Sequence, residues 1–210
     1  MRAETYEEAG YWEARADYLE HELKRAFARI DALEGTVEDL NREARTASDQ
    51  AHAENSTEAG MRRVWERFLY ECPTTAQITS LLTPSRAVAG MASEVARMAD
   101  ATLLRSADKV KALATAASYA ARFLPKDEDP LALALAEYRR AAQKHPGMTL
   151  ECDGHTDASR LFALMEEVGE VAACLTYDNT DSTGHNSDLT DEAVQVIGLA
   201  LAWATRYLEN

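Results

Sequence analysis

The sequence predicts an all-α protein built from three helical segments, and three observations carry this prediction. Residues 1–57 contain an apolar heptad repeat, which is typical of a long amphipathic helix. Residues 58–126 contain amphipathic and alanine-rich runs, and residues 127–210 contain helix-length apolar runs separated by polar loops. Nowhere does the chain show convincingly the alternation of apolar and polar residues that a half-buried β-strand requires.

The first segment, residues 1–57, is predicted to be one long helix with an oligomerising seam. The seam consists of two sets of residues spaced seven apart, which are Ala9, Ala16, Leu23, Ile30, Val37 and Ala44, and Trp12, Leu19, Ala26, Leu33, Leu40 and Ala47. Charged residues fill the positions between them, as a two-stranded coiled coil requires. The helix therefore either forms an intermolecular coiled coil or folds back onto the protein's own helices.

The middle segment, residues 58–126, is predicted to add further helices and contains no chemical motif. The small, polar stretch over 52–60 indicates a linker or a helix break. Helices are then expected over 61–71 and, between two prolines, over 74–82. An alanine-rich run follows, whose apolar positions are Val88, Met91, Val95, Met98, Leu103, Val110, Leu113 and Phe123. This segment can pack as a helix bundle or offer a surface to a partner.

Composition and charge exclude several classes of protein. The chain is 46% hydrophobic and 28% charged, and no stretch approaches the roughly 18 apolar residues of a membrane span. The start of the chain lacks the apolar core of a signal peptide, and the three cysteines are far apart and odd in number. These features predict a cytoplasmic protein with free thiols and no membrane partner. A net charge of −14 disfavours binding to nucleic acid, whose phosphates repel acidic surfaces.

The third segment, residues 127–210, carries a cluster of carboxylates on one of its predicted helices. Helices are expected over 131–143, 157–177 and 188–208, and the second contains Glu166, Glu167 and Glu170. These residues lie on one side of the helix because they are three and four positions apart. Like charges at these spacings repel, so they destabilise the helix unless a cation compensates. Mg²⁺ prefers such oxygen ligands, and the alternative is a solvated helix face.

The last predicted helix places acidic residues at the start of an apolar run. From 193 to 204 its only strongly polar side chain is Gln195, so this helix is expected to be buried on every side. Its first turn brings Asp188, Asp191 and Glu192. Acidic residues are favoured at a helix N-terminus by the macrodipole, and Gln195 can equally be a buried, hydrogen-bonded amide. By themselves, these residues indicate capping as readily as metal binding.

Together, the two acidic helices resemble the MazG-like all-α nucleoside-triphosphate pyrophosphohydrolases. The pattern of that family is an E-E-x-x-E helix, a short polar loop, and a second helix with E-x-x-D that enters an apolar run. Here the first motif is Glu166-Glu167-Val168-Gly169-Glu170 and the second is Glu192-Ala193-Val194-Gln195. The resemblance covers residues 127–210 and does not extend to the preceding residues.

The resemblance implies a Mg²⁺-dependent enzyme that hydrolyses a nucleoside triphosphate to the monophosphate and pyrophosphate. Glu167, Glu170 and Glu192 would be metal ligands, and Glu166 would be a further ligand or the group that orients water. The ions neutralise charge on the phosphates and lower the pKa of bound water. Such proteins are usually dimers or pairs of dimers, with helices from two subunits enclosing each site.

Gln195 departs from the family pattern, which usually has Asp at this position. An amide oxygen can bind a metal but adds no charge, so one ion binds weakly unless Asp188 or Asp191 supplies the missing carboxylate. Candidate substrate contacts outside the motifs are Lys144, Arg160 and His185. Surface solvation also explains Lys144 and Arg160, and a plain turn also explains His185.

Three hypotheses for function follow. The first is hydrolysis of (d)NTPs or related nucleotides by a homodimer or higher homo-oligomer. The second is a coiled-coil scaffold or regulator whose degenerate module binds nucleotide without efficient turnover. The third is nucleic-acid binding by residues 58–125, which carry nine basic and six acidic side chains, and this weak positive charge disfavours it.

Overall fold

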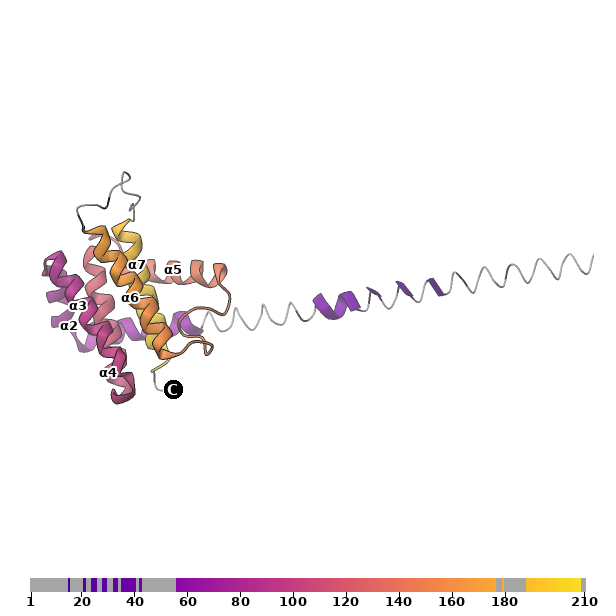
Figure 1. The fold of residues 1–210 in the computed structure, drawn as a ribbon, viewed down its shortest axis with the longest axis horizontal. Coiled ribbons are helices and arrows are strands. Elements are labelled where there is room, and N and C mark those ends of the chain that lie inside the picture. Colours follow the sequence, from indigo (N-terminus) through magenta and orange to yellow (C-terminus); the bar gives the residue numbers. More distant parts are fainter. Residues whose placement is uncertain are drawn as a thin grey trace, which may run out of the picture. The chain divides into compact units, whose positions relative to one another are not determined.

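The computed structural model describes residues 56–176, 179 and 188–208, together with positions 15, 21, 24, 25, 28, 29, 32, 33, 35–40 and 42. The described residues form helices joined by turns, with no strand among them, so the all-α prediction is confirmed (Figure 1). The chain divides into two units, Met1–Ala51 and His52–Asn210.

The first unit contains all positions of the predicted coiled-coil seam. All of its described residues are helical, and the side chains of Leu33, Val37 and Leu40 are 62%, 55% and 59% exposed. The other nine seam positions lie outside the described residues. The exposure of three apolar residues at seam positions agrees with a helix that buries this face against another helix. The coiled coil itself stays a prediction.

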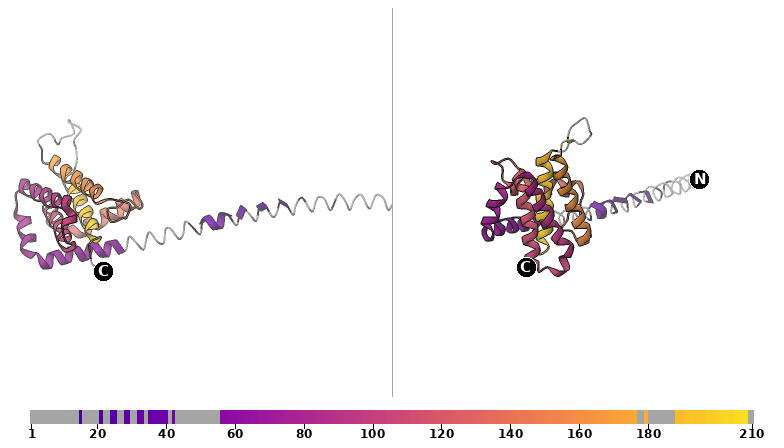
Figure 2. Two further views of the ribbon diagram at one scale, coloured as in Figure 1. Left: turned by 60° about the horizontal axis from the view of Figure 1, so that its bottom comes forward. Right: turned by 60° about the vertical axis from the view of Figure 1, so that its left-hand side comes forward.

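The second unit is a bundle of helices around α7. A helix over 56–71 is followed by α2 (Pro73–Leu81), α3 (Pro84–Arg97), the 3₁₀ helix η1 (Met98–Leu103), α4 (Ser106–Ala120), the 3₁₀ helix η2 (Ala121–Phe123), α5 (Pro130–Lys144), α6 (Asp157–Cys174) and α7 (Leu189–Thr205). Helix α7 packs against α4, α5 and α6 (Figures 1 and 2). Its residues Ile197, Leu201 and Trp203 are fully buried, which explains why this stretch of sequence is almost entirely apolar.

One hydrophobic core extends through the middle and third segments of the sequence. It joins Met61 and Leu113, from the middle segment, to Leu164 and Trp203 of the third. The charged sequence at 126–130, expected to end the middle segment, is a turn between two helices of this unit. The middle helices therefore contribute directly to the packing that positions α6 and α7.

The structure differs from the sequence prediction in two parts of the middle segment. Residues 56–60 are helical rather than linker-like, because Gly60 packs closely against Thr205 and Glu58 forms an ion pair with Arg139. The alanine-rich run is not one element either, since η1 separates α3 from α4. Leu103, expected to be an apolar packing position, lies at this break and is exposed.

Gly90, on α3, lies against the ring of Tyr119 and gives a first prediction about stability. A Cβ atom at position 90 would lie 2.5 Å from Cζ of Tyr119, far inside normal contact distance. We expect Gly90→Ala to lower the free energy of unfolding by about 1–3 kcal/mol through overpacking. The matched control is Gly169→Ala on α6, where a Cβ meets nothing within 4 Å, and this change should raise stability by up to about 1 kcal/mol. Urea denaturation measures both, and equal effects would contradict the packing explanation.

Candidate functional site

Capping fixes the two helices that carry the predicted acidic motifs. The Thr156 hydroxyl accepts a hydrogen bond from the Ser159 backbone and starts α6, while the Asp188 carboxylate accepts from Thr190 and Asp191 and starts α7. Side-chain caps of this kind stabilise a helix by about 1 kcal/mol each. Because α6 packs against α7, the first turn of α7 lies beside the acidic face of α6.

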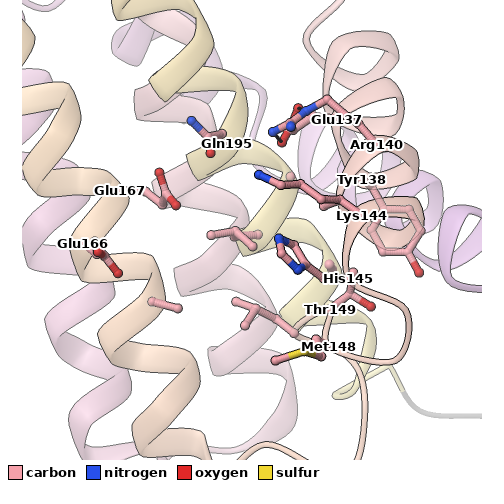
Figure 3. A pocket seen from close by; sticks show the side chains of 16 residues that line it. Glu137, Tyr138, Arg140, Lys144, His145, Met148, Thr149, Glu166, Glu167 and Gln195 are labelled. Atoms are coloured by element: carbon pink, nitrogen blue, oxygen red, sulfur yellow. Dashed lines mark hydrogen bonds and ion pairs between the residues drawn. The ribbon is translucent and has the colours of Figure 1, made fainter. Parts of the chain in front are cut away.

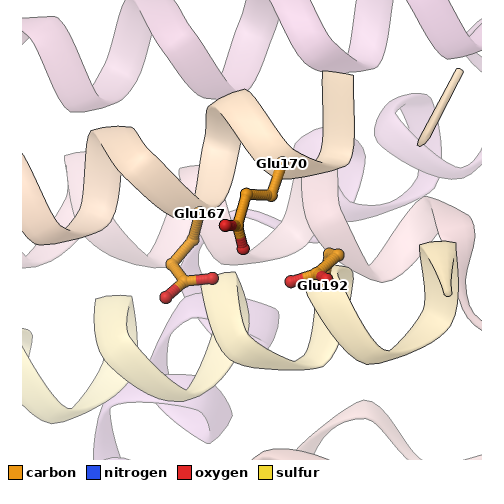
Figure 4. Close-up of side chains that lie close together, drawn as sticks. All are labelled: Glu167, Glu170 and Glu192. Carbon is orange, nitrogen blue, oxygen red and sulfur yellow. The ribbon is translucent and has the colours of Figure 1, made fainter. Parts of the chain in front are cut away.

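Three carboxylates meet where these helices pack. Glu167 and Glu170 extend from α6 toward Glu192 on α7 (Figure 4), and one oxygen of each lies within 4.8 Å of the others. Glu192 is only 9% exposed. The structure therefore brings together three of the residues that the sequence predicted as metal ligands, from two separate stretches of chain.

The cluster is electrostatically unfavourable when no cation is bound. Burial, followed by the charges of Glu170 and Glu192, raises the pKa of Glu167 from its ordinary value of 4.5 to about 8. The Oε2 atom of Glu167 is buried and has no hydrogen-bond partner. A hard divalent cation would satisfy this oxygen and remove the repulsion, and an all-oxygen donor set is what Mg²⁺ prefers. The residues present thus fit a divalent cation.

Gln195 lies one turn after Glu192, at the position where the family pattern has Asp. Its amide nitrogen donates a 2.7 Å hydrogen bond to Oε2 of Glu192. The amide therefore orients one of the clustered carboxylates and adds no negative charge. Asp188, which could replace the missing carboxylate, uses Oδ1 to cap α7, with a 2.7 Å bond from the Thr190 backbone.

A cleft of about 550 Å³ lies beside the cluster, between α5 on one side and α6 and α7 on the other. Its apolar lining consists of Ala141, Met148, Leu150, Ala163, Leu199 and Ala202. Glu166, Glu167 and Gln195 line the cleft from α6 and α7 (Figure 3). Glu166 therefore faces the cleft but does not belong to the cluster of three carboxylates. This position fits a role beside the metal ligands rather than as one of them.

Of the three predicted substrate contacts, the structure places only one in the cleft. Lys144 lines the cleft, as the sequence suggested. Arg160 does not line it, because the residue is only 2% exposed and its side chain donates to the backbone oxygens of Leu150 and Cys152 and to Asp157. These contacts hold the loop after α5 against α6. His185 lies outside the described residues.

Arg140 on α5 lines the cleft as well, although the sequence did not point to it. Arg140 lines the cleft together with Lys144, and it also lines a second cavity of about 550 Å³ beside Asp188, Asp191 and Glu192. Positions 140 and 144 are four apart and so share a helix face with Ala141 and Glu137. That spacing was visible in the sequence, but the approach of this face to the acidic helices depends on tertiary packing.

No protein-family model, curated protein or solved structure matches the chain. The resemblance to the MazG-like enzymes therefore rests on the two acidic motifs and stays a prediction. Among the residues that the structure describes, no helix has the length and apolar character needed to cross a membrane.

Proposed function

We propose that the protein is a Mg²⁺-dependent pyrophosphohydrolase that converts (d)NTPs or related nucleotides to the nucleoside monophosphate and pyrophosphate. The observation that carries the proposal is the group formed by Glu167, Glu170 and Glu192, whose oxygens lie within 4.8 Å of one another at the edge of a large cleft. Such a group is costly to assemble without a cation to neutralise it.

Each residue has a distinct role in this proposal. Glu167, Glu170 and Glu192 would hold the metal. When bound, Mg²⁺ would supply the positive charge that offsets the charge of the polyphosphate and acidifies water. Glu166 lines the cleft beside Glu167, where its carboxylate can accept a proton from the attacking water or orient that water. Gln195 positions Glu192 through the hydrogen bond to its carboxylate.

We also propose that the protein works as a cytoplasmic homodimer or higher homo-oligomer. The exposed apolar side chains of Leu33, Val37 and Leu40 support an assembly through the first unit. Nucleic acid is not the proposed partner, because the chain carries a net charge of −14.

The direct test is pyrophosphate release from a panel of NTPs and dNTPs in the presence of Mg²⁺. Glu170→Gln keeps the shape of the side chain but removes one negative charge from the cluster, so we expect release to fall by about 100-fold or more. The matched control is Glu66→Gln, an exposed residue on the helix over 56–71, which should retain full activity. Release that does not need Mg²⁺, or that survives in Glu170→Gln, contradicts the proposal.

A second candidate function is nucleotide binding without turnover, in a scaffold or regulator. The hydrogen bond from Gln195 to Glu192 favours it, since the amide occupies a carboxylate oxygen and lacks the charge of Asp. Mg²⁺-dependent binding of nucleotide with no pyrophosphate release in the wild-type protein would support this candidate. Turnover gained by Gln195→Asp would then identify the amide as the cause.

A further inference from the structure

The cations of the third segment are distributed unevenly with respect to the cleft. All five of its lysine and arginine side chains are described, and only Arg140 and Lys144 line the cleft. Arg139 pairs with Glu58, Arg160 holds the loop after α5, and Arg206 pairs with Asp153. In a segment with 16 acidic residues, two cations that face the same cavity are a concentration of positive charge.

These two cations and His145 form what we call the α5 wall. Figure 3 shows Lys144 and His145 reaching from α5 toward the side of the cleft that carries Glu167. Carboxylates occupy the opposite side, so a free anion would be repelled there. An anion that carries its own divalent cation would be attracted by both sides, because the cation meets the carboxylates and the phosphates meet the α5 wall.

Arg140 can bind such an anion without losing its present partner. Its Nε and one terminal nitrogen donate to Glu137 at 2.7 and 2.6 Å. A guanidinium has five N–H donors, so three remain for phosphate oxygens. The pair with Glu137 also fixes the direction of the guanidinium, whose side chain is 58% exposed and lies between the two cavities. Because the guanidinium is already oriented, less conformational entropy is lost when it binds a phosphate.

We propose that Arg140 and Lys144 bind the polyphosphate of the substrate, with the nucleoside extending toward the apolar lining of Leu150, Ala163 and Ala202. This inference rests on the proposed function and adds to it a group of cations that binds the phosphates of the substrate. The α5 wall selects molecules with several phosphates over the nucleoside monophosphate product, because additional negative charge contacts the same cations.

The test is calorimetric binding of inorganic triphosphate to the full chain in Mg²⁺, because this probe has no base and therefore leaves out any contact with the nucleoside. We expect Arg140→Gln/Lys144→Gln to bind it at least about 10-fold more weakly than wild type, with a shallower dependence on salt. The control is Arg139→Gln/Lys126→Gln, which removes the same charge from positions that do not line the cleft, and it should stay within about 2-fold of wild type.

Binding of Mn²⁺, measured by electron paramagnetic resonance, separates this inference from the proposed function. Both double variants should bind Mn²⁺ like wild type, since neither alters the carboxylates. Equal triphosphate affinity in both double variants, or no triphosphate binding by wild type, overturns the role of the α5 wall. Triphosphate binding that needs Arg140 and Lys144, in a protein that releases no pyrophosphate from any nucleotide, supports the wall and overturns the hydrolase.

Discussion

Replacing Arg160 with Ala is expected to lower the free energy of unfolding by about 3–4 kcal/mol. The guanidinium is buried and donates to the backbone oxygens of Leu150 and Cys152 and to the carboxylate of Asp157. Its removal leaves two carbonyl oxygens without these bonds and one carboxylate without its cation. Deleting one partner of a buried, hydrogen-bonded charge is among the most destabilising single changes.

Chemical denaturation of Arg160→Ala beside Arg139→Ala measures this effect. Arg139 also forms a two-point ion pair, but its side chain is 52% exposed, and exposed pairs contribute only about 0–1 kcal/mol. A role for Arg160 in substrate binding would give the opposite pattern, with stability close to wild type and a selective loss of nucleotide affinity. That pattern would show that the loop contacts do not explain why the residue is buried.

The sequence predicted which carboxylates share a face of each acidic helix. It did not predict that the two helices pack with these carboxylates side by side. Spacings of three and four positions place Glu167 and Glu170 on one side of α6, since they follow from the pitch of a helix. The position of Glu192 beside them depends on how α7 packs, and periodicity contains no information about this. The only reason to expect the two acidic helices to pack together was the resemblance of their motifs to those of the MazG-like enzymes.

Two arginine residues illustrate contacts that sequence patterns cannot predict. Arg160 and Arg140 both lie on helices near the acidic motifs, and nothing local distinguishes a buried loop anchor from a cleft residue. The difference arises because the loop after α5 turns at Gly147, whose φ of 72° favours glycine, and its carbonyl oxygens then point at Arg160. Contacts between distant residues similarly made residues 56–60 helical, although their composition favours a linker.

The metal-free protein is expected to lose stability as the pH rises from about 5 to 8.5. In the unfolded chain Glu167 titrates near 4.5, whereas burial and the neighbouring carboxylates raise its folded-state pKa to about 8. Between these values the folded protein binds more protons at Glu167 than the unfolded chain does, so the contribution of Glu167 to stability is largest below 4.5 and falls until the pH exceeds 8. After allowance for solvent screening of a half-buried group, we expect a loss of about 2 kcal/mol.

Urea denaturation of wild type and Glu167→Gln in a chelating buffer isolates this effect, because other titrating groups contribute equally to both proteins. Glutamine cannot ionise, so the variant should be more stable than wild type at pH 8.5, by about 2 kcal/mol, and similar to it at pH 5. Adding Mg²⁺ at pH 8.5 should stabilise wild type more than the variant, since only wild type offers the third carboxylate. Parallel pH profiles in the two proteins, with no difference on adding Mg²⁺, would contradict the prediction. They would mean that ionised Glu167 does not destabilise the folded protein and does not bind the cation.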